Sequence, residues 1–247
     1  MISIKSKKEV SLMREAGLVA VEVLEKIQNA LREGVTTAEI DKIAYDCIIG
    51  HQMKPSFLHY RGFSGSVCAS VNEVVIHGIP GKRRLQEGDI ISIDIGVCND
   101  GYHADCARTF GVGKISAEAK RLIEVTEQSF YEGIAHARAG ERLSNISHAV
   151  QTCAEAAGYG VVRDFVGHGV GSQLHEDPSI PNYGKPGRGV RLYPGMTIAV
   201  EPMITQGSYQ VRVLDDGWTT VTADGKLAAH YENTVLITEQ DPVILTK

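Results

Sequence analysis

The chain has 247 residues, of which 43% are hydrophobic and 22% are charged, and its formal net charge is −5. This length can bury a substantial core, and the charge balance gives no sign of the clustered basic footprint of nucleic-acid-binding proteins. No apolar run approaches the roughly 18 residues that span a bilayer, and the N-terminus lacks the apolar stretch of a secretory signal. The five cysteines form no CxxC pair. We therefore expect free thiols in a reducing compartment, the cytoplasm.

Two capping-box patterns predict the first two helices. Ser6 is followed three residues later by Glu9, ahead of apolar residues that recur every three or four positions up to Leu31. Thr36 and Glu39 repeat the pattern. In a capping box each side chain satisfies a free backbone N–H of the other residue, so both positions favour a helix start. Two further helices are predicted, over residues 116–138 and 144–158.

Segments rich in β-branched residues lie between and after these helices. They predict strands over residues 66–75, 89–97, 102–110, 196–204 and 234–238. Three Asp-Gly pairs predict hairpin turns, because both residues tolerate the left-handed backbone of a tight turn. The pairs are Asp100-Gly101, Asp216-Gly217 and Asp224-Gly225.

The two halves of the chain share a pattern. Arg32-Glu-Gly34 and Arg138-Ala-Gly140 each precede a predicted helix, 106 residues apart. At an offset of 107, Gly88 and Gly195 each lead an apolar strand that ends six residues later in a carboxylate. Matches in the same order at nearly one offset indicate a repeat. We expect an α+β fold in a single domain over residues 1–247, with an antiparallel sheet, outer helices and pseudo-twofold halves of about 1–115 and 116–247.

A pair of aspartates stands out in the first half. Asp94 interrupts an apolar strand, which alone is equally consistent with an exposed position on a one-sided strand. A turn at Asp100-Gly101 pairs residue 96 with Asp105, and a turn at Asn99-Asp100 pairs residue 94 with Asp105. Either register puts both carboxylates on one face, because side chains alternate along a strand. Two close carboxylates repel unless one is protonated or a cation lies between them.

The second half offers three more donors. Glu201 ends the strand that matches the Asp94 strand, Glu232 lies just ahead of an apolar strand, and His168 stands between two glycines. Taken singly, each is equally consistent with an ordinary surface or loop position. If the halves fold together, four unpaired carboxylates would cost far more than a domain's net stability. Two divalent ions remove that cost, share a water, make it hydroxide and polarise a carbonyl. The oxygen-rich set suits Mn²⁺, Fe²⁺, Co²⁺ or Zn²⁺.

Several stretches together resemble the type I methionine aminopeptidases of the pita-bread metallopeptidase family. They include Ser66-Val-Cys-Ala-Ser-Val-Asn-Glu73, His77-Gly-Ile-Pro80, Gly167-His-Gly169, His175-Glu-Asp-Pro178 and Glu201-Pro-Met203, with Asp94, Asp105 and Glu232-Asn233. The resemblance implies removal of the initiator methionine from nascent polypeptides, with a preference for a small second residue. Nothing in the sequence demands a dimer, so we expect a monomer, and a transient contact with the ribosome is an open expectation.

The same resemblance implies roles for the five donors. Asp94 would chelate one metal, Asp105 and Glu232 would bridge both, and His168 and Glu201 would hold the other.

The same resemblance implies which residues take part in catalysis and in substrate binding. Glu201 would also move a proton to or from the bridging water, while His77 and His175 would contact the substrate and stabilise the oxyanion. The methionine pocket would be built by Phe57, Tyr60, Phe63, Cys68, Leu174 and Trp218, for which ordinary core packing is the alternative interpretation.

Two positions depart from the family pattern. Leu174 stands where many members carry an aromatic residue, which changes the pocket shape, and Ser64 stands where a proline is common, which favours a more mobile loop. Two other functions stay open: a prolidase-like aminopeptidase, which usually carries an extra N-terminal domain, and a non-catalytic pita-bread binding module, which usually loses metal ligands.

Overall fold

The computed structural model of the chain describes residues 2–247. The helices are α1 (Lys7–Ala30), α2 (Thr37–Gly50), the 3₁₀ turn η1 (Tyr60–Gly62), α3 (Ala117–Ile134) and α4 (Leu143–Ala156). The strands are β1 (Lys54–Pro55), β2 (Cys68–Val71), β3 (Val74–Ile76), β4 (Ile90–Asn99), β5 (Tyr102–Gly111), β6 (Gly160–Val161), β7 (Gly167–Gly169), β8 (Glu176–Ile180), β9 (Thr197–Val200), β10 (Met203–Thr205), β11 (Val211–Val213), β12 (Thr220–Thr222), β13 (Ala228–His230), β14 (Glu232–Leu236) and β15 (Val243–Ile244).

Both predicted capping boxes are present. In α1 the Ser6 N–H donates to Glu9 Oε2 at 2.6 Å, and in α2 the Thr36 N–H donates to Glu39 Oε2 at 2.8 Å. The third helix ends at Ile134, four residues before its predicted end. The N–H groups that follow donate three residues back, as in Ala137 N to Ile134 O at 2.9 Å, so the last turn tightens instead of continuing.

Two predicted strands are divided in the structure. The first breaks at Asn72, which has a left-handed φ of 55°, and becomes β2 and β3. The second breaks at Pro202, which has no N–H for the ladder, so the chain leaves the main sheet after Glu201 and enters a second sheet as β10. The last predicted strand begins two residues earlier than expected, so Glu232 lies inside β14 and not ahead of it.

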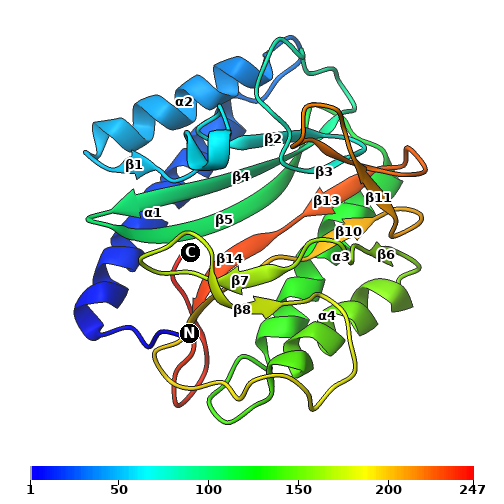
Figure 1. Cartoon of the computed structure of the whole chain (residues 1–247). Coiled ribbons are helices and arrows are strands. Elements are labelled where there is room, and N and C mark those ends of the chain that lie inside the picture. The colour runs from blue at the N-terminus through cyan, green and yellow to red at the C-terminus, as the bar shows by residue number, and fades with distance from the viewer. Residues whose placement is uncertain (1) are drawn as a thin grey trace.

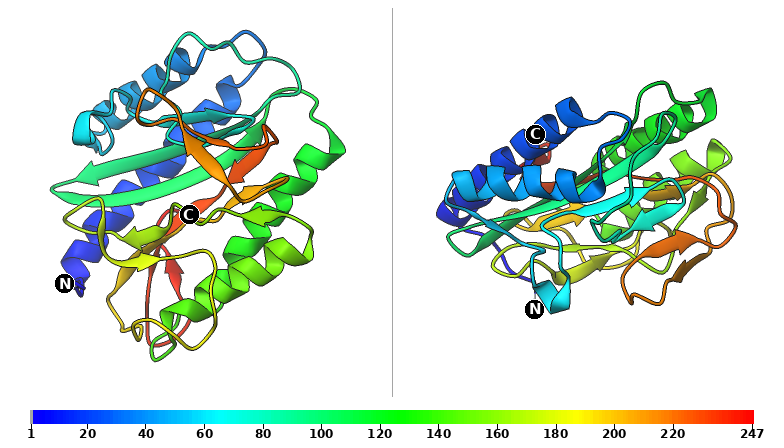
Figure 2. Two further views of the ribbon diagram at one scale, coloured as in Figure 1. Left: turned by 45° about the vertical axis from the view of Figure 1, so that its right-hand side comes forward. Right: turned by 90° about the horizontal axis from the view of Figure 1, so that it is seen from above.

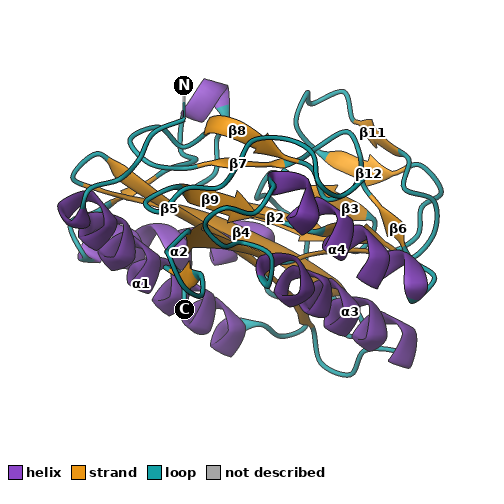
Figure 3. Ribbon diagram, turned by 90° about the horizontal axis from the view of Figure 1, so that it is seen from below, coloured by secondary structure: helices purple, strands orange, loops and turns teal. Residues whose placement is uncertain are grey.

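Within the described residues, nine strands form the main sheet. Its path runs β1-β4-β5-β14-β9-β7-β8, with β2 beside β4 and β15 beside β14, and every pairing is antiparallel. The long helices cover one face of this sheet, while the short strands and loops lie on the other (Figures 1, 2 and 3). In the same residues, no helix has both the length and the apolarity needed to cross a membrane.

The β4–β5 hairpin turns at Asp100-Gly101, as the first of the two registers predicted. Both turn residues have left-handed φ angles, 47° and 84°, and Gly96 lies opposite Asp105. The second Asp-Gly pair also lies in a hairpin, but in a longer loop, closed by the Leu214 N–H on Thr219 O at 2.8 Å. The third does not make a hairpin, because β12 and β13 belong to different sheets.

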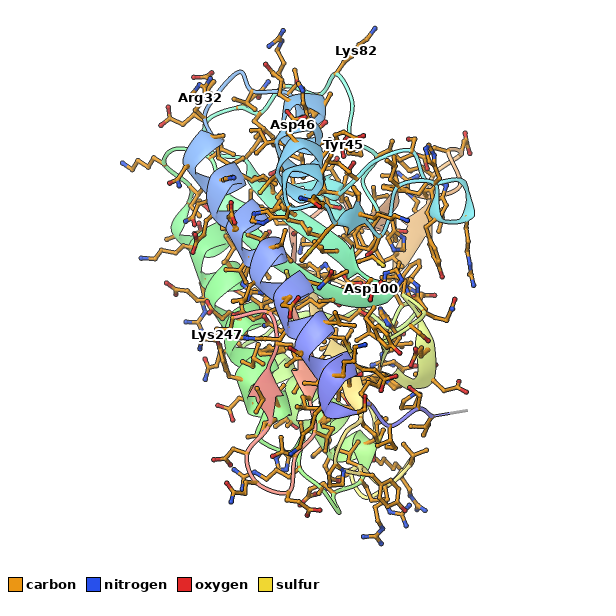
Figure 4. The ribbon with its side chains drawn as sticks, turned by 90° about the vertical axis from the view of Figure 1, so that its left-hand side faces the viewer. Arg32, Tyr45, Asp46, Lys82, Asp100 and Lys247 are labelled. Atoms are coloured by element: carbon orange, nitrogen blue, oxygen red, sulfur yellow. The ribbon has the colours of Figure 1, made fainter. Side chains whose placement is uncertain are left out.

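The hydrophobic core lies between the sheet and the helices. Side chains alternate along β4: Ile91, Ile93 and Ile95 point into the cluster formed with α1 and α2, which leaves the even-numbered residues for the opposite face. On β9, Ile198 and Val200 likewise point into a second cluster that includes residues of α3 and α4. The outer side of α1 and α2 carries polar side chains (Figure 4). Each half of the sheet thus has one apolar face that packs against the helices and one face that can carry functional side chains.

Matching hydrogen bonds recur in the two halves. Gly34 N donates to Leu85 O at 2.8 Å and Gly140 N donates to Leu192 O at 2.9 Å. The corresponding arginine bonds run from Arg84 to Gly34 O and from Arg191 to Gly140 O, at 2.7 and 2.9 Å. These bonds occur at the offsets of 106 and 107 residues that the sequence contains. We propose on this basis that the chain is a single domain built from two copies of one unit.

Candidate metal centre and substrate pocket

Three adjacent strands carry the first three donors. Asp94 on β4 and Glu232 on β14 both lie opposite Ala107 of the intervening strand β5. Asp105 is two residues from Ala107, so it shares the same face. A small side chain at Ala107 leaves open space between the carboxylates. The ladder hydrogen bonds of β4, β5 and β14, which lie side by side in Figure 1, therefore fix all three groups on the sheet face opposite the helix-packed isoleucines of β4.

The other two donors come from the second half of the sheet. His168 on β7 lies opposite Ala199 of β9, and Glu201 is two residues beyond Ala199 on the same face. His168 Nε2 lies 3.5 Å from Glu201 Oε1. Pro202 bends the chain out of the main sheet just after Glu201. All five predicted donors therefore face one region.

The pKa values of all four carboxyl groups are raised above their usual range. Burial raises the pKa of Asp94 to about 7. Burial, reinforced by the charges of Glu232 and Asp94, raises the pKa of Asp105 well above its usual range. The pKa of Glu201 and that of Glu232 are raised in the same way, first by burial and then by the neighbouring carboxylates. Such a cluster is stable at neutral pH only with protons or cations among its oxygens.

Several oxygens of this cluster have no hydrogen-bond partner in the part of the chain that the structure describes. Among the described residues, Asp94 Oδ1, Asp105 Oδ1 and Glu232 Oε1 are buried without a hydrogen bond. Donor atoms of Asp105, His168 and Glu232 lie within 4.8 Å of one another. Unpaired buried oxygens at this spacing fit divalent metal ions, which would neutralise the charges and complete the contacts.

His168 is set up as a neutral ligand. Its Nδ1 lies 2.8 Å from Gly169 O, and because a carbonyl can only accept, Nδ1 must carry the proton. The lone pair is then on Nε2, which faces Glu201. Burial lowers the pKa of His168, so the ring stays neutral. A carbonyl that fixes the tautomer in this way is the usual partner of a metal-binding histidine.

The two other predicted histidines line the same cavity as the carboxylates. Burial lowers the pKa of His77 to about 4, and burial together with His168 lowers that of His175 to about 3. The ring of His175 lies 4.1 Å from that of His168, and its Nδ1 is 3.0 Å from Tyr60 Oη. If Tyr60 is the donor of this bond, His175 Nε2 carries a proton that it can donate.

The predicted pocket residues line one cavity of about 380 Å³ together with the metal-ligand candidates. Phe63 packs edge-on against Trp218 at 5.2 Å between ring centres. The six are Phe57, Tyr60, Phe63, Cys68, Leu174 and Trp218. The sequence did not indicate Arg61, Asp164 and Phe165, which also line the cavity and which the folding of loops brings there.

One further residue of the centre was missed. His230 is buried, and its Nε2 lies 3.7 Å from Glu232 Oε2 and 3.9 Å from Glu201 Oε2. It stands two positions before Glu232, so strand alternation around Glu232 could have indicated it. Burial lowers the pKa of His230 to about 3, so the ring is neutral.

A second group of donors lies on the helical side of the molecule. Glu22 of α1, Cys47 of α2 and His51, just past α2, have donor atoms within 4.8 Å of one another. Here the ammonium of Lys26 already lies 2.7 Å from Glu22 and 3.3 Å from Cys47. This cluster contains its own cation, unlike the carboxylate cluster in the cavity.

The sequence profile of metallopeptidase family M24 matches residues 11–239. The chain belongs to this family. A methionine aminopeptidase of Clostridium perfringens is 55% identical over 246 residues, which cover 100% of this chain and 99% of the relative. The predicted resemblance to methionine aminopeptidases is thereby confirmed.

Solved structures confirm the α+β pita-bread fold. The methionine aminopeptidase of Thermotoga maritima superposes with a TM-score of 0.98 at 43% identity, and the match covers 100% of both chains. A prolidase from Pyrococcus furiosus has a TM-score of 0.80 at 23% identity, with 99% of this chain and 65% of the prolidase covered. The prolidase likeness extends to the fold alone.

Proposed function

We propose that the chain removes the N-terminal methionine from nascent polypeptides through a centre of two divalent metal ions. The observation that carries this proposal is the convergence of four carboxylates, three of them buried, and one neutral imidazole at a cavity lined by aromatic side chains. Full-length relatives named methionine aminopeptidases support the same activity. Bound ions would activate water and polarise the scissile carbonyl.

The five donors divide the metals between them. Asp94 would chelate one ion, Asp105 and Glu232 would be shared by both ions, and His168 and Glu201 would hold the other. The central position of Asp105 and Glu232 supports their bridging role, because their strands, β5 and β14, are neighbours in the middle of the sheet. The donor set suits Co²⁺, Mn²⁺, Fe²⁺ or Zn²⁺.

Protein groups handle the protons and the oxyanion. Glu201, which directly follows β9, would accept the proton that the attacking water loses and pass it to the leaving amine. His77 and His175 are neutral near pH 7 and donate N–H groups to the oxyanion. One preorganised donor of this kind typically contributes about 10²–10³-fold in kcat.

Selectivity for methionine comes from the pocket. An unbranched thioether fits between aromatic rings such as Phe63 and Trp218, and sulfur–aromatic contacts add about 0.3–1.5 kcal/mol. A charged side chain would be buried there without a partner, at a cost of several kcal/mol. The second residue of the substrate lies beside the crowded metal centre, so small residues are preferred.

We place this activity in the cytoplasm, where nascent chains arise, with the chain acting as a monomer that contacts the ribosome only transiently. Two other functions were open from the sequence. A non-catalytic binding module does not need a complete donor set, and this chain has one. A prolidase-like activity would require a pocket for proline after the scissile bond.

Hydrolysis of Met-Ala-Ser tests the proposal. We expect cleavage by the purified chain, loss after EDTA treatment and recovery when Co²⁺, Mn²⁺, Fe²⁺ or Zn²⁺ is added singly. An Ala-Pro dipeptide, the prolidase substrate type, should stay intact under the same conditions. Full activity in a demonstrably metal-free sample, or preferential cleavage of Ala-Pro, would contradict the proposal.

A further inference from the structure

His230 is a buried histidine that has no part in the mechanism proposed above. Its side chain is 2% exposed, and neither Nδ1 nor Nε2 has a hydrogen-bond partner among the described residues. An imidazole always carries at least one N–H, and a neutral ring also has a lone pair. Leaving such groups unpaired in the interior costs about 1–3 kcal/mol. At least one ring nitrogen therefore needs a partner other than the described protein groups.

The distances from the His230 ring to the nearby carboxylate oxygens are those expected between donors that bind the same metal ion. Its distances of 3.9 Å to Glu201 Oε2 and 3.7 Å to Glu232 Oε2 are too long for hydrogen bonds. A ring nitrogen of His230 and carboxylate oxygens of Asp94 and Glu232 all lie within 4.8 Å of one another. Donors bound to one ion at about 2.0–2.2 Å are themselves roughly 3–4 Å apart. The observed spacing matches that pattern.

The backbone holds the ring in this place. The His230 N–H donates to Thr109 Oγ1, and the Thr109 hydroxyl donates to His230 O, both at 2.9 Å. On its other edge the residue pairs with Met203 of β10. His230 and Glu232 are two residues apart, so their side chains project toward the same side. With its backbone held on both edges, the residue is kept beside the carboxylates.

We propose that His230 is a sixth protein ligand of the metal centre. This inference rests on the proposed function, because it presupposes metal ions at the carboxylate cluster. A second imidazole shifts the donor set from oxygen toward nitrogen. Imidazole suits Zn²⁺, Fe²⁺, Co²⁺ and Ni²⁺, whereas carboxylate and water suit Mn²⁺ and Mg²⁺. The centre therefore prefers Co²⁺ to Mn²⁺ more strongly than it would without His230.

Cobalt titration tests the inference in the full chain. Protein stripped with EDTA and dialysed is titrated with Co²⁺ alone and, separately, with Mn²⁺ alone. We expect His230→Gln to weaken the binding of one Co²⁺ by at least about 10–100-fold, the range measured for residues that only support a ligand. The visible Co²⁺ spectrum should change, and Mn²⁺ affinity should fall less. The matched control is His103→Gln, because His103 is hydrogen-bonded to Ser56 at 2.8 Å and lies outside the carboxylate cluster.

A second measurement needs no substitution. In wild-type protein labelled with ¹⁵N-histidine and loaded with Co²⁺, each ligating ring that keeps an N–H gives one strongly shifted proton signal. We expect two such signals, from His168 and His230. A single signal, or an unchanged spectrum and affinity in folded His230→Gln, overturns the inference and leaves the proposed function intact. Failure of the wild-type chain to bind Co²⁺ at all overturns the metal centre itself.

Discussion

The floor and the rim of the cavity are built in different ways. The floor is made by Asp94, Asp105 and Glu232, which stand on neighbouring strands whose ladder hydrogen bonds set their positions. The rim is made by loops, where Arg61 and His77 have left-handed φ angles of 49° and 58°. Non-glycine residues in that region are strained and need surrounding contacts to hold them.

The functional side chains of the floor and of the rim are therefore held in position by different interactions. On the floor, backbone geometry places the charges, so a substitution changes the chemistry while leaving the frame in place. On the rim, side-chain contacts such as Tyr60 to His175 and Phe63 to Trp218 fix the shape. A substitution there shifts the position of neighbouring groups. We expect floor variants to lose metal and rim variants to keep it.

The largest effect is expected from the bridging carboxylates. Asp105→Asn and Glu232→Gln keep the shape of the side chain but remove a charged ligand. Metal content and hydrolysis of Met-Ala-Ser should fall together, to the level of the EDTA-treated protein. Atomic absorption and a peptide assay on the same samples measure both. If either variant retained two metal ions per chain, the expectation that floor variants lose metal would be wrong.

The Asp105→Asn variant also tests how the stability of the metal-free protein depends on pH. Burial, with Glu232 and Asp94, raises the folded-state pKa of Asp105, whereas in the unfolded chain an aspartate titrates near about 3.9. The folded state then binds more protons, so metal-free wild type loses stability as pH rises above about 4. Asn carries no such dependence. Metal-free Asp105→Asn should therefore melt above metal-free wild type at pH 8, with a difference that shrinks toward pH 4.5. An equal difference at both pH values would contradict this.

The next largest effect is expected from the histidines of the rim. His77→Ala and His175→Ala should retain both metals and lower kcat by about 10²–10³-fold, because each removes one oxyanion donor. Measurement of kcat and metal content on the same preparation separates this from ligand loss. Wild-type kcat in His175→Ala would remove its assigned role.

A smaller effect is expected from a buried ion pair that supports the rim. Lys5 Nζ lies 2.6 Å from Glu176 Oε2, with side chains only 4% and 10% exposed. The other Glu176 oxygen accepts the Gln173 N–H at 3.1 Å, which ties the turn that carries Leu174 and His175. Lys5→Met and Glu176→Gln should lower kcat/KM by up to about 10²-fold through misplaced groups, with metals retained.

An exposed ion pair of similar length provides the control. Lys42 and Asp46 on α2 are 2.8 Å apart but 73% and 56% exposed, and Figure 4 shows Asp46 on the outer helical side. Lys42→Met should change stability by under about 1 kcal/mol and leave kcat/KM unchanged. If Lys5→Met lowered the melting temperature with no change in kcat/KM, the pair would be structural only.

The smallest effect is expected within the pocket. Leu174→Phe restores an aromatic residue at a buried position beside Phe57 and Phe63. One side-chain change in an apolar pocket typically shifts selectivity by about 1–3 kcal/mol. Preference among Met-, norleucyl- and Leu-Ala-Ser should change more than preference among Met-Ala-, Met-Val- and Met-Lys-Ser. Equal shifts in both series would place residue 174 outside the methionine pocket.

Local patterns in the sequence predicted the parts that depend on local rules. The two-residue period and the Asp-Gly turn placed Asp94 and Asp105 on one face, and the capping boxes placed two helices. The sequence pattern did not indicate that β14 inserts between β5 and β9, because this pairing joins residues far apart in the chain. The resemblance to a known family supplied that convergence.

Other features depend mainly on contacts between segments that are far apart in the chain. The split at Pro202 follows from a strand that leaves one sheet for another, which a continuous apolar run conceals. His230 was missed because it looked like one more residue ahead of a strand. Its place in the centre depends on the pairing of β13 with β10 and on the Thr109 side chain.

Anomalous X-ray diffraction from crystals loaded with Co²⁺ tests the central claim most directly. Data collected at the cobalt edge locate each ion without reference to activity. We predict two peaks about 3.5–4 Å apart, enclosed by Asp94, Asp105, His168, Glu201 and Glu232. No peak at these five residues, in crystals shown by their fluorescence to contain cobalt, would contradict it.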